Sequence, residues 1–140
     1  MGKKGATKNV LVIPCSGIGK VHGLLSREAM YEIVGKPTNV KTDTLCLALL
    51  VMGDEAALSK TRNSICLTID GCPKFCAKKG VEATGGQVSR SILVNDALKN
   101  HRGEQFGTAA KLTDCGWDVV HEIAEGLETE IVKLRGGGDE

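Results

Sequence analysis

Aromatic side chains and long apolar runs are scarce in this sequence. One tryptophan, one tyrosine and two phenylalanines make up 3% of the 140 residues, so aliphatic side chains have to fill the core. The longest apolar run, Leu45–Met52, is far shorter than a bilayer span. Val10–Ile13 is too short for the hydrophobic region of a secretory signal. We therefore expect a cytoplasmic protein that does not interact with a membrane.

An excess of charge of one sign is also missing. Lysine and arginine number 18 and acidic residues 17, which gives a net charge of +1 and predicts no attraction to nucleic acid. A content of 41% hydrophobic and 25% charged residues is typical of a folded domain and excludes a disordered chain. We expect a single domain over residues 9–134, with flexible tails at residues 1–8 and 135–140.

Continuous apolar runs alternate with helical patterns along this domain. The predicted strands are Asn9–Pro14, Ile65–Ile69 and Val88–Val94. The predicted helices are Val21–Val34, a short buried helix Asp43–Met52, Glu55–Thr61, Pro73–Ala83, a short piece near Asn95–Lys99, and Thr113–Leu134. This alternation predicts a small three-layer α/β fold, with a mostly parallel sheet of three to four strands and helices on both faces.

Three of the six cysteines follow these strands in a regular way. Cys15 comes directly after the first strand, and Cys72 follows the strand Ile65–Ile69. Cys76 lies four residues after Cys72, so a helix starting near Pro73 predicts that both thiols share one helix face. Ligands gather at the carboxyl ends of parallel strands, and we expect the three thiols to meet there.

Cys46 is the fourth candidate if its predicted helix caps the same edge of the sheet. Four thiolates match a closed tetrahedral zinc site, with Zn–S distances of about 2.3 Å. In a reducing cytoplasm, metal or redox roles outrank disulfides. The alternative is that the cysteines act as small buried hydrophobic residues. That alternative is favoured for Cys66, inside a strand, and for Cys115, at the start of the last helix.

Other motifs near the cysteines have ordinary interpretations. Gly17–Lys20 resembles part of a phosphate-binding loop, but Pro14 and Val21 stand where that loop needs glycine and a hydroxyl. His22 offers a substitute ligand, although a solvated first-turn histidine is favoured, and His101 and His121 are expected at the surface. Asp70 is expected to orient the Cys72 turn, to support the site or to act as an acid or base. Three lysines lie near Cys76 in the sequence: Lys74, Lys78 and Lys79. Their positive charges would offset the negative charge of a metal centre with four thiolates, but a solvated surface is the simpler interpretation.

The segment Ile69-Asp70-Gly71-Cys72-Pro73, with Cys76 behind it and Cys15-Ser16-Gly17 after the first strand, resembles the DGC-domain family. That family is named for its central Asp-Gly-Cys motif and groups zinc-binding proteins without a known reaction. The resemblance extends over about Val10–Val94. It implies four metal ligands, Cys15, Cys46, Cys72 and Cys76, and leaves Cys66 and Cys115 outside the site.

These observations lead to two functional hypotheses. The first is a zinc-binding protein with a four-cysteine site at the carboxyl edge of the sheet and a structural or sensor role, because a full thiolate shell leaves no open position on the metal. The second is an enzyme that uses the same cysteines for an iron–sulfur cluster or for thiol-based redox or sulfur-transfer chemistry. A module that binds a protein partner is a third class, which no particular residue favours.

Overall fold

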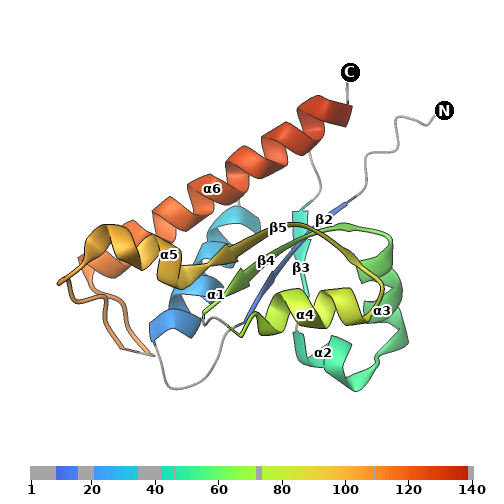
Figure 1. The fold of residues 1–140 in the computed structure, drawn as a ribbon, viewed down its shortest axis with the longest axis horizontal. Coiled ribbons are helices and arrows are strands. Elements are labelled where there is room, and N and C mark those ends of the chain that lie inside the picture. Colours follow the sequence, from blue (N-terminus) through green and yellow to red (C-terminus); the bar gives the residue numbers. More distant parts are fainter. Residues whose placement is uncertain are drawn as a thin grey trace.

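A computed structural model describes residues 9–15, 21–34, 42–45, 47–71, 74–108 and 110–138 (Figure 1). The strands are β2 (Val10–Pro14), β3 (Thr42–Thr44), β4 (Ile65–Asp70) and β5 (Gln87–Leu93). The helices are α1 (Val21–Val34), α2 (Leu47–Met52), α3 (Glu55–Arg62), α4 (Cys76–Ala83), α5 (Val94–Leu98), the 3-10 turn η1 (Lys99–His101) and α6 (Asp114–Gly138).

The described strands form one parallel sheet in the order β3-β2-β4-β5. Helices α1, α5 and α6 cover one face, and α2, α3 and α4 cover the other (Figure 1). The predicted three-layer α/β fold with a parallel sheet is therefore confirmed. The chain leaves β2 for α1 on one face and leaves β4 for α4 on the opposite face, so the connections diverge between these two neighbouring strands.

Two aliphatic cores lie on the two faces of the sheet. Every residue of β2 is buried, and alternate side chains point to opposite faces. Val10 and Val12 pack with α1 and α6, whereas Leu11 and Ile13 pack with α2, α3 and α4. Because both faces of β2 are covered, all of its side chains are apolar, and this continuous apolar run is the sequence pattern from which the strand was predicted.

Polar side chains and a glycine mark several of the helix ends. The Asp54 carboxylate accepts a hydrogen bond from the backbone N–H of Ala57 and caps α3. Thr113 Oγ1 accepts one from the N–H of Gly116 at the start of α6. Gly85 adopts a φ of 89° after α4, a conformation that favours glycine. Local chemistry thus sets these boundaries.

The predicted helix Asp43–Met52 is wrong over its first part. Thr42–Thr44 is a strand that pairs with Val10–Val12 of β2, and Thr44 Oγ1 donates a hydrogen bond to the Val12 carbonyl at 2.7 Å. The strand is short and polar, so its pairing with β2 decides its conformation rather than its own pattern. Helix α2 is also less buried than predicted, since 78% of Val51 and 77% of Met52 are exposed.

The predicted start of α4 at Pro73 is wrong as well. Phe75 takes a left-handed conformation with a φ of 54°, and the helix begins at Cys76. Helix α4 therefore does not extend back toward Cys72, and it does not place Cys72 and Cys76 one turn apart on a shared helix face.

Helix α6 is longer than the sequence pattern indicated. It continues beyond Leu134 to Gly138, where the sequence predicted a flexible tail from Arg135. Its buried positions Val119, Val120, Ile123, Leu127 and Ile131 match the predicted apolar stripe. Among the described residues, no helix is both long and apolar enough to cross a membrane.

Candidate metal centre

The carboxyl ends of three neighbouring strands each lead into a cysteine. Cys15 follows Pro14 of β2, Cys46 comes shortly after Thr44 of β3, and Cys72 comes shortly after Asp70 of β4. Neighbouring strands lie about 4.8 Å apart, so the three strand ends span roughly 10 Å. Cys46 and Cys72 lie outside the described residues, but the strand ends that precede them are described.

Cys15 is anchored through its backbone to both sides of the strand end. Its N–H donates to the carbonyl of Ile69 on β4 at 2.8 Å. Its own carbonyl accepts a hydrogen bond from Ser26 Oγ of α1 at 2.9 Å. The partly buried Cys15 therefore lies at the junction of β2, β4 and α1, where the sheet connections diverge and α/β folds place their ligands.

Asp70, the last residue of β4, connects that strand to the start of α4. Its side chain is buried, and its carboxylate accepts hydrogen bonds from the N–H of Ala77 at 2.7 Å and of Lys78 at 3.3 Å. Burial raises the pKa of Asp70 above its usual range, and these two hydrogen bonds, together with the charge of Lys78, offset only part of the effect. Asp70 thus fixes the position of the start of α4 relative to the end of β4.

Gly71, the residue after β4, allows α1 to approach the end of that strand closely. A Cβ at position 71 would lie 3.1 Å from His22 Cβ and 3.3 Å from the His22 carbonyl carbon, so a larger residue would push α1 away. His22 is itself only partly exposed, and its Nδ1 is buried without a hydrogen-bond partner in the described part of the chain. The expectation of a solvated His22 is therefore wrong, because the end of β4 packs against it.

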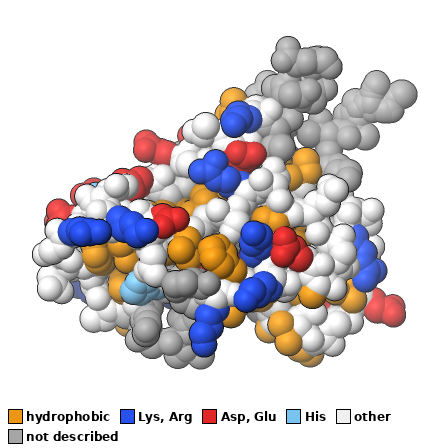
Figure 2. Space-filling view, in the orientation of Figure 1, with side chains coloured by type: hydrophobic (Ala, Val, Ile, Leu, Met, Phe, Trp, Pro, Cys, Tyr) orange, Lys and Arg blue, Asp and Glu red, His pale blue; other side chains and the backbone are white. Residues whose placement is uncertain are grey.

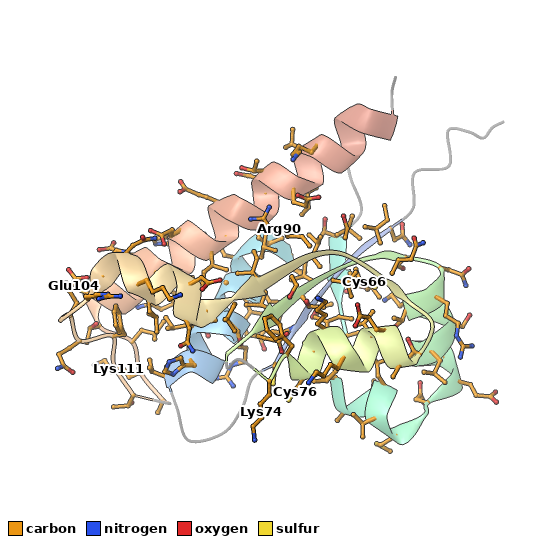
Figure 3. All side chains as sticks on the ribbon, viewed as in Figure 1. Cys66, Lys74, Cys76, Arg90, Glu104 and Lys111 are labelled. Carbon is orange, nitrogen blue, oxygen red and sulfur yellow. The ribbon has the colours of Figure 1, made fainter. Side chains whose placement is uncertain are left out.

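Cys76 is the first residue of α4, and its side chain is exposed (Figure 3). The N–H groups of the next two residues, Ala77 and Lys78, donate to Asp70, so Cys76 begins a helix whose first turn is held against the end of β4. Lys74 and Lys79 are exposed beside it, and Figure 2 shows basic side chains on this face of the molecule. Lys78 Nζ lies 5.7 Å from the centre of the Phe75 ring and so packs over the turn before the helix.

Cys15 and Cys76 thus lie at the same edge of the sheet. Cys15 pairs with the end of β4, and Asp70 at that strand end holds the helix that Cys76 begins. Within the described ranges, no three His, Cys, Asp or Glu side chains are placed to hold a metal ion, and two of the four predicted ligands fall outside these ranges. Soft thiol donors at the end of neighbouring strands are chemically suited to zinc or an iron–sulfur cluster.

Cys66 has a different environment. It is the second residue of β4, and with a rise of about 3.3 Å per residue its Cα lies roughly 13 Å from that of Asp70. The side chain is fully buried, and its Sγ lies 3.6 Å from the carbonyl oxygen of Thr61. Burial raises the pKa of Cys66 to about 11, so the thiol stays protonated at neutral pH and packs as a small apolar side chain.

Cys115 lies in the first turn of α6, among carboxylates. Desolvation raises the pKa of its thiol, and the negative charges of Glu104, Asp118 and Asp114 raise it further. The nearby His101 has its Nδ1 3.0 Å from Glu104 and its Nε2 3.3 Å from Glu122, and these contacts raise the pKa of the imidazole. A thiol held in its neutral form by acidic neighbours is a poor metal ligand.

A small cavity lies away from the cysteine edge. Its volume is about 190 Å³, and it opens between β5, α5 and α6, with Arg90, Asp96 and Glu122 among its lining residues. None of its described lining residues is a cysteine. The cavity and the candidate metal centre are therefore separate features.

The sequence profile of one protein family, the DGC domain, matches residues 11–123. The chain belongs to the DGC domain family. The match covers all four described strands apart from Val10, and it includes both Cys15 and Cys76. No curated protein and no solved structure matched the chain. Membership of this family is consistent with a metal-binding protein.

The structure gives each part of the DGC motif a physical role in this family member. Asp70 holds the start of α4, and Gly71 leaves room for α1 at His22. Cys72, the third residue of the motif, lies outside the described residues. The sequence pattern left three roles open for Asp70, one of which was to orient the Cys72 turn, whereas its observed partners are backbone N–H groups of α4. The contact between Gly71 and His22 has no signal in the sequence, because it joins segments far apart in the chain.

Cys66→Ala and Cys115→Ala are expected to keep any metal that the wild-type protein binds. Both thiols have a raised pKa and neither follows the carboxyl end of a strand. The measurement is the metal content of each folded variant by elemental analysis. Loss of stoichiometric metal from either variant, with the circular dichroism spectrum unchanged, would show that the four ligands were chosen wrongly.

Proposed function

We propose that this DGC domain binds one zinc ion through Cys15, Cys46, Cys72 and Cys76. The observation that carries the proposal is the order of the strand ends. One of these cysteines follows each of the adjacent strands β3, β2 and β4 within two residues, and the fourth begins the helix that Asp70 attaches to β4. Parallel strands end at one edge, so the topology supports the convergence of thiols from four separated chain positions.

Residues 42–44 form strand β3 instead of the predicted helix, and this difference strengthens the proposal. The sequence pattern left Cys46 in a helix whose position relative to the sheet was open. The described strand Thr42–Thr44 pairs in parallel with Val10–Val12 of β2. The strand before Cys46 and the strand before Cys15 therefore end at the same edge of the sheet. Leu47, the residue after Cys46, approaches α4 so closely that a Cβ at Gly80 would lie 2.8 Å from its Cδ1. Both chain neighbours of Cys46 are thus held near the cysteine edge.

The electrostatic surroundings support thiolate ligands. A zinc ion with four thiolates carries two net negative charges. The exposed and positively charged Lys74 and Lys79 lie beside Cys76 at the start of α4. Zinc would fix the relative positions of the three strand ends and α4. Because four thiolates leave no open position, the centre is assigned a structural or sensor role and not a hydrolytic one.

Protein purified without added metal is expected to contain about one zinc per chain by elemental analysis. The motivation is the set of four converging cysteines, each of which would supply one tetrahedral ligand. A brown protein with absorption near 400 nm, containing iron and inorganic sulfide, would instead indicate the iron–sulfur alternative. Folded protein with free thiols and no metal of either kind would contradict a metal-binding function.

A further inference from the structure

His22 carries a buried polar atom that the fold itself does not satisfy. It is the second residue of α1, and its Nδ1 has no hydrogen-bond partner in the described part of the chain. Burying a polar nitrogen without a partner is unfavourable, and such atoms are rare in folded proteins. The position of His22 therefore indicates a hydrogen-bond partner that is not one of the described protein groups.

The surroundings of His22 point to the cysteine edge. Its Cβ and carbonyl carbon lie against Gly71, which precedes Cys72 in the chain. The same first turns of α1 hold the end of β2, because Ser26 Oγ donates to the Cys15 carbonyl. Cys15 in turn donates its N–H to Ile69 of β4. His22 thus lies where the ends of β2 and β4 meet α1, on the side of the edge opposite α4.

We propose that His22 is a positioning residue of the metal centre, whose Nδ1–H donates a hydrogen bond to a metal-bound thiolate. The inference rests on the proposed metal site and assigns a role to a residue outside the four ligands. Thiolate sulfurs keep lone pairs after they bind zinc, and a centre with two net negative charges favours hydrogen-bond donors around it. His22 is not a ligand in this arrangement, because four thiolates already complete the tetrahedral shell.

The test compares three substitutions that all keep the Cβ packed against Gly71. An asparagine amide nitrogen lies close to the position of the histidine Nδ1, whereas a glutamine amide nitrogen lies closer to that of Nε2. We expect His22→Ala and His22→Gln to weaken zinc binding by about 10- to 100-fold in competition with a chromophoric chelator. His22→Asn is expected to bind zinc nearly as tightly as the wild type. All four proteins should still bind one zinc per chain.

Cobalt substitution adds a readout that a purely structural role would not change. The thiolate-to-cobalt absorption bands should shift in His22→Ala and His22→Gln relative to the wild type and His22→Asn, with the intensity of a four-sulfur site retained. The metal-free His22→Ala protein should melt close to metal-free wild type, because the substitution removes no hydrogen bond between Nδ1 and the described part of the chain.

Several outcomes would overturn the inference. Equal zinc affinity in the wild type and His22→Ala would show that Nδ1 does not contact the centre. An equal loss in all three variants, with cobalt spectra of a site lacking one ligand, would make His22 a ligand instead of a donor. Wild-type protein that binds no metal would overturn the proposed function and this inference together, whereas the first two outcomes leave the metal site standing.

Discussion

Replacing Cys15 or Cys72 with serine is expected to abolish stoichiometric zinc binding and to lower the melting temperature by on the order of 10 °C, while most helix and strand remain. The reason is that the metal and the cores stabilise different parts of the molecule. The two aliphatic cores lie on the faces of the sheet, and neither of the two described ligands, Cys15 and Cys76, is one of their fully buried members. Zinc would tie together only the carboxyl edge.

The ligands are separated in the chain, so zinc binding closes loops of about thirty and twenty-five residues, between Cys15 and Cys46 and between Cys46 and Cys72. The entropy of closing such loops grows only slowly with length. A zinc finger unfolds without its metal because it has almost no other core. This domain has strands whose residues are buried on both faces, such as β2, and is expected to stay folded after chelation.

Circular dichroism and thermal melts of the serine variants and of chelated wild type provide the measurement. Cys115→Ser is the matched control, because it removes a thiol outside the proposed set and should change neither metal content nor melting temperature. Hydrogen exchange should show α2 loosening first, since Leu50 is its only fully buried residue in the described structure. A random-coil spectrum of the chelated protein at room temperature would show that the metal, and not the aliphatic cores, holds the fold.

Asp70→Ala is expected to lower the free energy of unfolding by about 2–4 kcal/mol and to weaken zinc binding about 10- to 100-fold. The carboxylate is the shared acceptor for the N–H groups of Ala77 and Lys78 at the start of α4. Alanine leaves both groups without this acceptor, and the Ala77 side chain beside them is fully buried. The start of α4 then loses its connection to β4, and Cys76 loses its position.

Asp70→Asn separates the hydrogen bonds from the charge. Because burial raises the pKa of Asp70, the negative charge itself is unfavourable in the fold, and the stability that Asp70 contributes falls as the pH rises through that pKa. The amide oxygen of asparagine keeps the acceptor for the Ala77 N–H without the charge, whereas the weaker hydrogen bond from the Lys78 N–H is lost. Asp70→Asn should therefore lose much less stability than Asp70→Ala at neutral pH, and it should keep more of the zinc affinity.

Asp54→Ala is the control for losing a helix cap away from the cysteine edge. Asp54 caps α3 by accepting one hydrogen bond from Ala57, and its removal should cost about 1 kcal/mol and leave zinc binding unchanged. Urea unfolding and zinc competition on the variants at Asp70 and Asp54 give both quantities. An Asp70→Ala protein with wild-type zinc affinity would show that the position of Cys76 does not depend on this contact.

Local patterns in the sequence were sufficient for the fold class and for most elements. The apolar runs at β2 and β4 predicted strands buried on both faces, and the spacing of apolar residues predicted α1 and the buried stripe of α6. These signals are strong because a whole segment carries them. The high pKa and burial of Cys66 also agree with its predicted role as an apolar side chain inside a strand.

Contacts between distant segments decided the rest. Thr42–Thr44 is a strand because β2 offers it a hydrogen-bonded edge, and neither its length nor its composition predicts this. Helix α4 starts at Cys76 because the Phe75 backbone turns left-handed and the buried Asp70 carboxylate accepts the N–H groups that follow. The unpaired Nδ1 of His22 depends on the packing of α1 against Gly71. Each of these features joins residues whose proximity arises only after the sheet has formed, so no local pattern in the sequence encodes them.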